Sequence, residues 1–244
     1  MSERVYPDGA LLYSFDDTSV PEWVDALPLF LETGARVTFF VTRPDEVIAA
    51  HSEGLRALVA AGHAIGCHGL RHLKAVDSVA EFGMDGYLER DVLPAVACLR
   101  AAGFTPTAFA YPCSQNNKAT DDALLQHFRY LRTGRIPHTG KRLCDMDELF
   151  VPFAAMPARA CLAGTGTDYA GMAARPDMVG QACEAIDRAR ATASVLALYA
   201  HNISDSAHGH RIPIEALRAI LIHARAVDLP AITFDNLCAG CEKA

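Results

Sequence analysis

Ala10-Leu11-Leu12-Tyr13-Ser14-Phe15-Asp16-Asp17 begins as a nearly unbroken apolar run and ends in two adjacent carboxylates. A continuous apolar run, rather than an alternating one, is typical of a parallel strand that is covered on both faces. The stretch therefore predicts a buried strand with an acidic pair at its carboxyl end. Taken alone, an Asp-Asp pair at such a place also fits a helix cap or a turn.

Similar apolar runs recur along the chain and alternate with helical patterns. Strands are expected at residues 10–15, 36–41, 63–67, 107–111, 130–133, 149–154, 195–200 and 231–234, and helices at 52–61, 78–102, 121–128, 176–192 and 213–227. Repeated strand–helix units around one core predict an α/β fold: a single (β/α) barrel of seven or eight strands, or failing that a doubly wound sheet. Within the irregular stretch 135–175, Gly164-Thr165-Gly166-Thr167 is expected to be a flexible loop.

Composition is that of an ordinary globular protein. Of 244 residues, 51% are hydrophobic and 21% charged, and we expect residues 1–244 to form one domain. No apolar stretch approaches the roughly 20 residues of a membrane span. The net charge is −7 and no cluster of Lys and Arg is longer than two residues, which argues against nucleic acid and membranes as partners. The N-terminus shows no secretory signal, so a cytoplasmic location is expected unless a leader has been removed.

A second polar group follows another apolar run, Ala64-Ile65-Gly66-Cys67. His68 comes directly after this run and His72 four residues later. Two imidazoles and one carboxylate can hold a borderline metal such as zinc and leave a position open for water. A second carboxylate beside them could take a proton from that water. The histidines also fit a hydrogen-bonded core, and Gly69 stands where the H-E-x-x-H motif has its glutamate.

Polar residues follow other predicted strands as well. Tyr111-Pro112-Cys113 ends the strand at 107–111, and His201 follows the apolar run at 195–200. In a barrel the carboxyl ends of the strands meet on one face, where active sites lie. We therefore expect these residues, the acidic pair and the histidine pair to surround one pocket.

The motifs together resemble those of the polysaccharide deacetylase family, also called the NodB-homology domain or family 4 carbohydrate esterases. The family's T-F-D-D motif corresponds to Ser14-Phe15-Asp16-Asp17, and its H-[S/T]-x-x-H motif to His68-Gly69-Leu70-Arg71-His72. Its third motif corresponds to Phe109-Ala110-Tyr111-Pro112-Cys113-Ser114, and its late L-x-x-H motif to Leu198-Tyr199-Ala200-His201. The order of the motifs, with a closing strand at 232–237, extends over residues 10–237.

The resemblance implies a NodB-like deformed TIM barrel and a metal-dependent hydrolase. Asp16 would be the general base, His201 the general acid, and the backbone N–H of Cys113 a donor to the oxyanion. The substrate would be a small molecule or oligosaccharide that carries an N-acyl group, most simply an acetylated amino sugar. The metal would be zinc, with cobalt or another divalent ion as alternatives.

The metal ligands implied by the resemblance are Asp17, His68 and His72. Substrate contact is expected from Tyr111, Pro112 and Arg132.

Three departures from the family pattern are visible. Gly69 replaces the Ser or Thr whose hydroxyl ties down the metal-binding loop, so a looser loop is expected. Ala110 stands where many relatives carry an arginine that steadies the catalytic acid, and Arg132 on the next strand could replace it. Cys113 and Ser114 replace the usual aromatic residue and glycine, which leaves a backbone donor but alters the pocket.

Several other side chains have two readings. His63 is expected to be a buried, hydrogen-bonded imidazole, and His208 and His210 to lie in a solvated loop. Trp23 and Tyr111 either stack on a sugar or pack in the core.

Two alternatives to sugar deacetylation remain. The same site fits a cytosolic hydrolase of a non-sugar amide or a cyclic ureide. The altered third motif and Gly69 also fit a family member that binds carbohydrate without turning it over.

Overall fold

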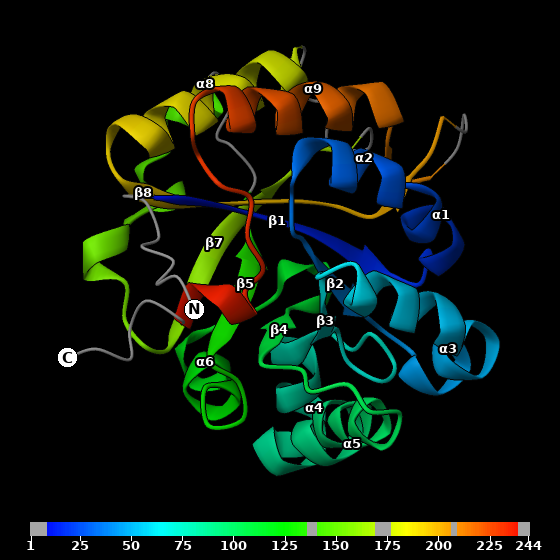
Figure 1. The fold of residues 1–244 in the computed structure, drawn as a ribbon. Coiled ribbons are helices and arrows are strands. Elements are labelled where there is room, and N and C mark those ends of the chain that lie inside the picture. Colours follow the sequence, from blue (N-terminus) through cyan, green and yellow to red (C-terminus); the bar gives the residue numbers. More distant parts are fainter. Residues whose placement is uncertain (1–8, 136–140, 169–176, 206–208, 239–244) are drawn as a thin grey trace.

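Seven parallel strands form a closed ring, and helices pack around its outside (Figure 1). The computed structural model describes residues 9–135, 141–168, 177–205 and 209–238. Within these residues, each strand of the ring pairs with the next and the last pairs with the first. The strands are β1 (Ala10–Asp17), β2 (Thr38–Val41), β3 (Ala64–Cys67), β4 (Ala108–Ala110), β5 (Tyr130–Gly134), β7 (Ala160–Gly166) and β8 (Ser194–Ala200). The predicted α/β barrel is confirmed.

The ring is deformed where β7 meets β8. Only the carboxyl half of β8, at residues 197–199, pairs with β7. Along its amino half, residues 194–196 pair with a short antiparallel strand, β6 (Phe150–Pro152). The strand expected at 149–154 is therefore a wedge in the wall rather than a member of the parallel ring.

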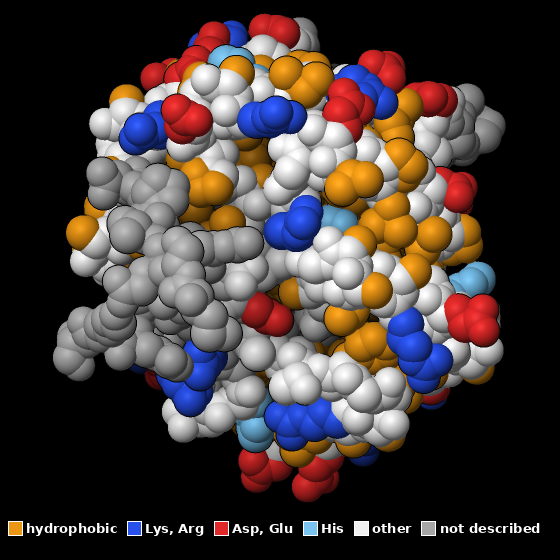
Figure 2. Space-filling view, viewed as in Figure 1, with side chains coloured by type: hydrophobic (Ala, Val, Ile, Leu, Met, Phe, Trp, Pro, Cys, Tyr) orange, Lys and Arg blue, Asp and Glu red, His pale blue; other side chains and the backbone are white. Residues whose placement is uncertain are grey.

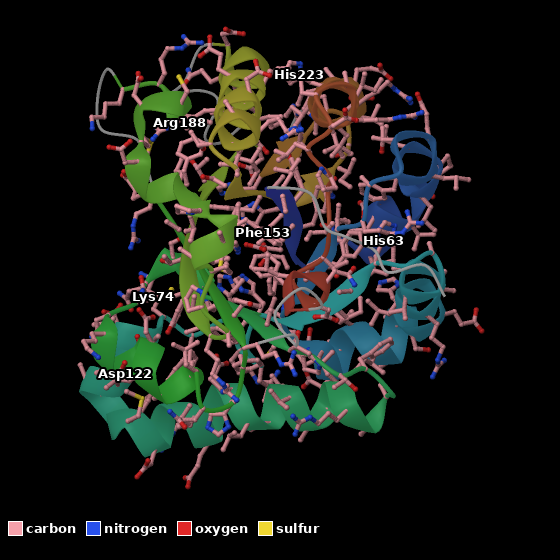
Figure 3. The ribbon with its side chains drawn as sticks, turned by 60° about the vertical axis from the view of Figure 1, so that its left-hand side comes forward. His63, Lys74, Asp122, Phe153, Arg188 and His223 are labelled. Atoms are coloured by element: carbon pink, nitrogen blue, oxygen red, sulfur yellow. The ribbon has the colours of Figure 1, made fainter. Side chains whose placement is uncertain are left out.

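Helix α8 (Met178–Ala191) holds this wedge from outside. The guanidinium of Arg188, labelled in Figure 3, lies 4.2 Å from the centre of the Phe150 ring. It also donates to the Cys144 carbonyl and to the Asp147 carboxylate, both at 2.6 Å. One side chain thus joins α8 to the segment that leads into β6.

The remaining helices cover the outside of the ring. They are α1 (Val20–Asp25), α2 (Leu27–Thr33), α3 (Pro44–Ala60), α4 (Ala75–Tyr87), α5 (Leu93–Ala101), α6 (Lys118–Leu124) and α9 (Ile214–Ala226). The single helix expected at 78–102 is wrong, because Gly83 at φ +75° and a π-helical turn at Leu88–Val92 interrupt it. Helices α1 and α2 were not expected, since six or seven residues are too few to display a helical period.

The loop expected at Gly164-Thr165-Gly166-Thr167 is also wrong. Its first three residues belong to β7, and both threonines are fully buried. Neither glycine has the positive φ that a turn would require. A Cβ at Gly164 would lie 3.4 Å from the side chain of Arg132, and one at Gly166 would lie 3.4 Å from the Tyr199 ring.

The last expected strand, at 231–234, is not formed. Ala231 makes a single bridge to Leu11, and the chain then runs across the ring to a short turn at Asp235–Cys238 (Figure 1). Phe234 packs against Phe40 with their ring centres 5.3 Å apart. This segment closes the amino end of the barrel as a plug.

Side chains alternate along each strand between an outer core and the barrel interior. The outer core, under the helices, takes every second residue of β1: Leu11, Tyr13 and Phe15. Leu12 belongs to the inner core, and so does Tyr130 of β5. The same alternation places Asp16 and Arg132 inside the barrel.

The described residues contain no helix with the length and apolarity needed to cross a membrane. Figure 2 shows that acidic and basic side chains are interspersed over the visible face rather than gathered by sign.

His63, labelled in Figure 3, is the expected core histidine. Its Nδ1 accepts a hydrogen bond of 3.2 Å from the Val37 N–H, and its ring meets those of Phe30 and Phe39 edge-on. Burial, helped by the positive charge of Arg36, lowers the pKa of His63 to about 4.

We expect His63 to make the protein less stable in mild acid. The unfolded chain binds a proton at this residue more readily than the folded one. The contribution of neutral His63 to the free energy of unfolding is therefore complete above pH 6.5 and is lost as the pH falls toward 4. The loss amounts to about 3 kcal/mol. Urea unfolding at several pH values should show that acid lowers the free energy of unfolding less in His63→Asn than in the wild type. The amide oxygen of Asn can still accept from the Val37 N–H but does not titrate. An equal loss in the variant and the wild type would contradict the assignment.

Candidate active site

Three predicted metal ligands meet at the carboxyl ends of β1 and β3. Asp17 ends β1, His68 follows β3, and His72 lies on the same loop. The Oδ1 atom of Asp17 is 3.7 Å from Nε2 of His68 and 3.4 Å from Nε2 of His72. A tetrahedral zinc ion with bonds near 2.1 Å keeps its ligand atoms about 3.4 Å apart. The donor set and its spacing therefore fit a divalent metal.

His68 is held in the tautomer that a metal requires. Its Nδ1 lies 2.8 Å from the Ala110 carbonyl, which can only accept, so Nδ1 carries the proton. The lone pair is then on Nε2, which faces Asp17. Burial lowers the pKa of His68, and this keeps the ring neutral at physiological pH.

The loop that carries His68 and His72 is anchored by Asp91, a residue that the sequence analysis did not single out. Asp91 is fully buried on the π-helical turn before α5, and its Oδ1 accepts from the Arg71 N–H at 2.6 Å. Its backbone carbonyl accepts from the Leu70 N–H at 3.0 Å. Gly69 has φ +79°, and a Cβ there would overlap the Asp91 carboxylate. The expectation of a looser loop is therefore wrong, because this carboxylate takes the place of the missing hydroxyl.

Restoring the family residue with Gly69→Ser should consequently weaken the site. The new Cβ would displace Asp91, and we expect divalent-metal affinity to fall on the order of 10–100-fold, as when a supporting contact of a ligand is lost. Gly103→Ser is the matched control, because Gly103 has φ +91° and no atom within 4 Å of the position of its Cβ. Calorimetric metal titration should separate the two, and equal affinities would contradict the role of Asp91.

Asp16 and Arg132 form an ion pair inside the barrel. Nη2 of Arg132 donates to Oδ2 of Asp16, and the two residues are only 1% and 3% exposed. The guanidinium lies 4.1 Å from the centre of the Tyr199 ring and 5.5 Å from that of Phe40. Oδ1 of Asp16 is buried and has no hydrogen-bond partner among the described residues. One carboxylate oxygen is thus held by Arg132 while the other remains available.

The third motif lies next to His68, because the Ala110 carbonyl contacts Nδ1 of that histidine. Tyr111 is 1% exposed and its hydroxyl donates to Asp121 at 2.8 Å, and Pro112 is buried as well. Burial leaves neither side chain able to contact a sugar, and the same holds for Arg132, so the substrate contacts expected of these three residues are not supported. Trp23 is likewise a core residue, fully buried.

Cys113 has an exposed side chain and an unusual backbone. Its φ is +53°, and its N–H has no hydrogen-bond acceptor among the described residues. The role of donor to an oxyanion, expected of this N–H, stays a prediction.

His201 is paired with Asp168, which the sequence analysis missed. Nδ1 of His201 lies 2.5 Å from Oδ2 of Asp168, and the Trp23 indole donates to the His201 carbonyl at 2.8 Å. Burial disfavours the charged imidazole, but the hydrogen bond that His201 donates to Asp168 and the charges of Asp16, Asp168 and Asp17 prevail and raise the pKa of His201. Asp168 lies two residues after β7, a strand that the sequence analysis predicted to end in a loop.

Backbone strain is concentrated at this end of the barrel. Five of the non-glycine residues with positive φ lie at or just after β1 to β4: Asp17, Arg43, His72, Cys113 and Ser114. Such conformations cost about 1–3 kcal/mol each and persist where the surroundings impose them. A cleft of about 720 Å³ opens here, lined by Asp17, His72 and His201 among others.

The family model described as polysaccharide deacetylase matches residues 4–129, just over half of the chain. The chain belongs to the polysaccharide deacetylase family. The matched segment contains Asp16, Asp17, His68, His72 and Cys113. No curated protein sequence matched the chain.

Solved structures of polysaccharide deacetylases share the fold. A putative polysaccharide deacetylase from Mycobacterium smegmatis is 16% identical with a TM-score of 0.60, over 97% of this chain and 91% of that one. The peptidoglycan deacetylase PdaC from Bacillus subtilis is 14% identical with a TM-score of 0.54, over 96% and 92%. The Bc1960 peptidoglycan N-acetylglucosamine deacetylase is 13% identical with a TM-score of 0.57, over 95% and 89%.

Arg132 contacts Asp16 from β5, the strand next to Ala110, as the sequence analysis allowed. Ala110 and Arg132 are direct partners in the pairing of β4 with β5. The guanidinium therefore enters the barrel interior from the next strand.

Proposed function

We propose that this protein is a divalent-metal-dependent N-deacetylase that hydrolyses the acetamide of an N-acetylated sugar. The observation that carries the proposal is the meeting of Asp16, Asp17, His68, His72 and His201 at one end of the barrel. Capping or packing roles would not require these residues to converge from three strand ends.

The chemistry of the donor set supports a metal at Asp17, His68 and His72. Two neutral imidazoles and a carboxylate are preferred by zinc and also accept cobalt. When bound, such an ion polarises a carbonyl and makes a water molecule more acidic. The buried, unpartnered Oδ1 of Asp16 is the kind of atom that a reacting water would satisfy.

Asp16 and His201 would divide the proton transfers between them. Arg132 occupies Oδ2 of Asp16, so Oδ1 is the atom left to accept a proton from the attacking water. Asp168 holds the Nδ1–H of His201, which turns Nε2 toward the cleft as the atom that protonates the departing amine. The raised pKa of His201 favours the protonated form needed for that step.

The backbone N–H of Cys113 would stabilise the oxyanion as the acetamide carbonyl becomes tetrahedral. A free N–H needs no reorganisation to donate, and one such donor is worth about 10²–10³ in rate. The side chain of Cys113 takes no part in this role.

The proposed substrate class follows from the relatives. One solved relative is described as a peptidoglycan N-acetylglucosamine deacetylase, and another as a peptidoglycan deacetylase. An acetylated amino sugar, free or in an oligosaccharide, is the substrate class that we infer from these names.

An acetate-release screen tests the proposal. The purified protein would be incubated with N-acetylglucosamine, its oligomers and other N-acetylated sugars, with zinc, with cobalt or with chelator. We expect acetate release from at least one sugar, and only when metal is present. Ring opening of allantoin-like ureides in a parallel assay would reassign the substrate, and metal binding without turnover on either panel would leave a carbohydrate-binding protein.

A further inference from the structure

His210 gives this site a second cluster of metal-ligating side chains. Asp168, His201 and His210 each offer one ligand atom, and these atoms lie within 4.8 Å of one another. Asp17, His68 and His72 satisfy the same description, so the cleft carries two sets of two histidines and one aspartate. The expectation of a solvated loop holds for His210 only in part, since its side chain is exposed but reaches the site.

The backbone places His210 beside His201. A two-stranded parallel sheet joins β9 (Asn202–Ile203), which follows His201, to β10 (Arg211–Ile212), which follows His210. The Asn202 N–H donates to the His210 carbonyl at 3.1 Å. The ring centres of the two histidines are 5.0 Å apart as a result. The main chain of His210 is thus held by the β9–β10 pairing, while its side chain is exposed.

The geometry points to a second zinc site formed by Asp168, His201 and His210, whose occupation takes His201 out of acid catalysis. Two imidazoles and a carboxylate again match the preference of zinc. Nδ1 of His210 is 3.9 Å from Oδ2 of Asp168, close to the separation of two ligands on one ion. Such a site would make excess zinc an inhibitor of the protein.

Filling this site requires a small, defined rearrangement. Nδ1 of His201 and Oδ2 of Asp168 are 2.5 Å apart because a proton joins them. Zinc would replace the Nδ1 proton of the doubly protonated His201, and the two atoms would separate to about 3.4 Å, the distance between ligands on a tetrahedral ion. That proton is released to solvent, and the Nε2–H bond remains, so His201 binds as a neutral imidazole. Because a hydrogen bond must be given up, this site should fill after the one at Asp17.

Metal counting tests the site without relying on activity. In equilibrium dialysis of the full chain against zinc, we expect two ions per chain for the wild type. His210→Ala should bind one ion at the same free zinc, because losing a ligand weakens the second site on the order of 10–100-fold or more. His223→Ala is the matched control and should bind two. His223 is a partly exposed histidine on α9, labelled in Figure 3, which lies 2.7 Å from Asp187.

Deacetylase assays test the consequence, which alone rests on the proposed function. The informative quantity is the ratio of turnover at excess zinc to turnover at one equivalent. This ratio should be about 0.1 or lower in the wild type and in His223→Ala, because excess zinc inhibits both. It should be near one in His210→Ala, which lacks the second site. One zinc ion per wild-type chain, or two in His210→Ala, would overturn the second site. Two ions with no turnover at any zinc level would overturn the proposed function and leave the second site standing.

Discussion

Replacing Asp17 with Asn should remove the bound metal and lower kcat/KM by about 10⁴-fold or more, because the electrophile and the activated water are lost together. The amide oxygen of Asn carries no charge and is a poor replacement for a carboxylate ligand. Asn tolerates the left-handed region well, so the backbone at φ +83° is preserved. Metal content after dialysis and turnover of the best acetylated sugar are the two measurements.

Asp228→Asn is the matched control for this change. Asp228 also has a positive φ, +56°, but lies after α9 at the amino end of the barrel. It should retain metal, turnover and melting temperature. Full activity in Asp17→Asn, with metal still bound, would contradict the assignment of the ligand.

Replacing Asp16 with Asn should lower kcat by about 10²–10⁴-fold while the metal remains bound. The amide cannot accept the proton that Oδ1 is proposed to take. The change also leaves the buried guanidinium of Arg132 without its counter-ion, which costs about 3–5 kcal/mol of folding stability. Turnover, metal content and urea unfolding of the same preparation would be compared.

A double variant separates the catalytic loss from the structural one. Replacing a buried ion pair with apolar groups of similar volume is often neutral for stability. Asp16→Asn combined with Arg132→Met should therefore recover much of the stability lost in Asp16→Asn but none of the activity. Recovery of both would mean that Asp16 contributes only to folding.

The barrel could be predicted from the sequence because its inner and outer faces are both buried. Strands such as β1 and β8 are therefore continuous apolar runs that stand out from their flanks. The strand β7 was missed for the opposite reason. Its carboxyl end, Gly164-Thr165-Gly166, has a composition typical of a loop, although Thr165 is fully buried in the structure.

The candidate site could be predicted in part for a similar reason. Asp17, His68 and His72 follow strong strands and form short local motifs, so their meeting in space could be anticipated. Asp168 and Asp91 act through long-range contacts, among them those to His201 and to the Arg71 N–H. No local sequence pattern predicts such a contact, because a single aspartate outside a motif does not indicate which distant residue it will contact.

The wedge at β6 has a consequence for where the barrel wall opens locally. A continuous ladder surrounds the end that carries the proposed chemistry, whereas the opposite end has a wall held partly by side chains such as Arg188. Breathing of the protein should begin at that weaker wall, and amide exchange should be faster at residues 194–196 than at residues 197–199. Local opening would then occur at the end of the barrel opposite to the proposed catalytic residues, whose positions it would leave unchanged.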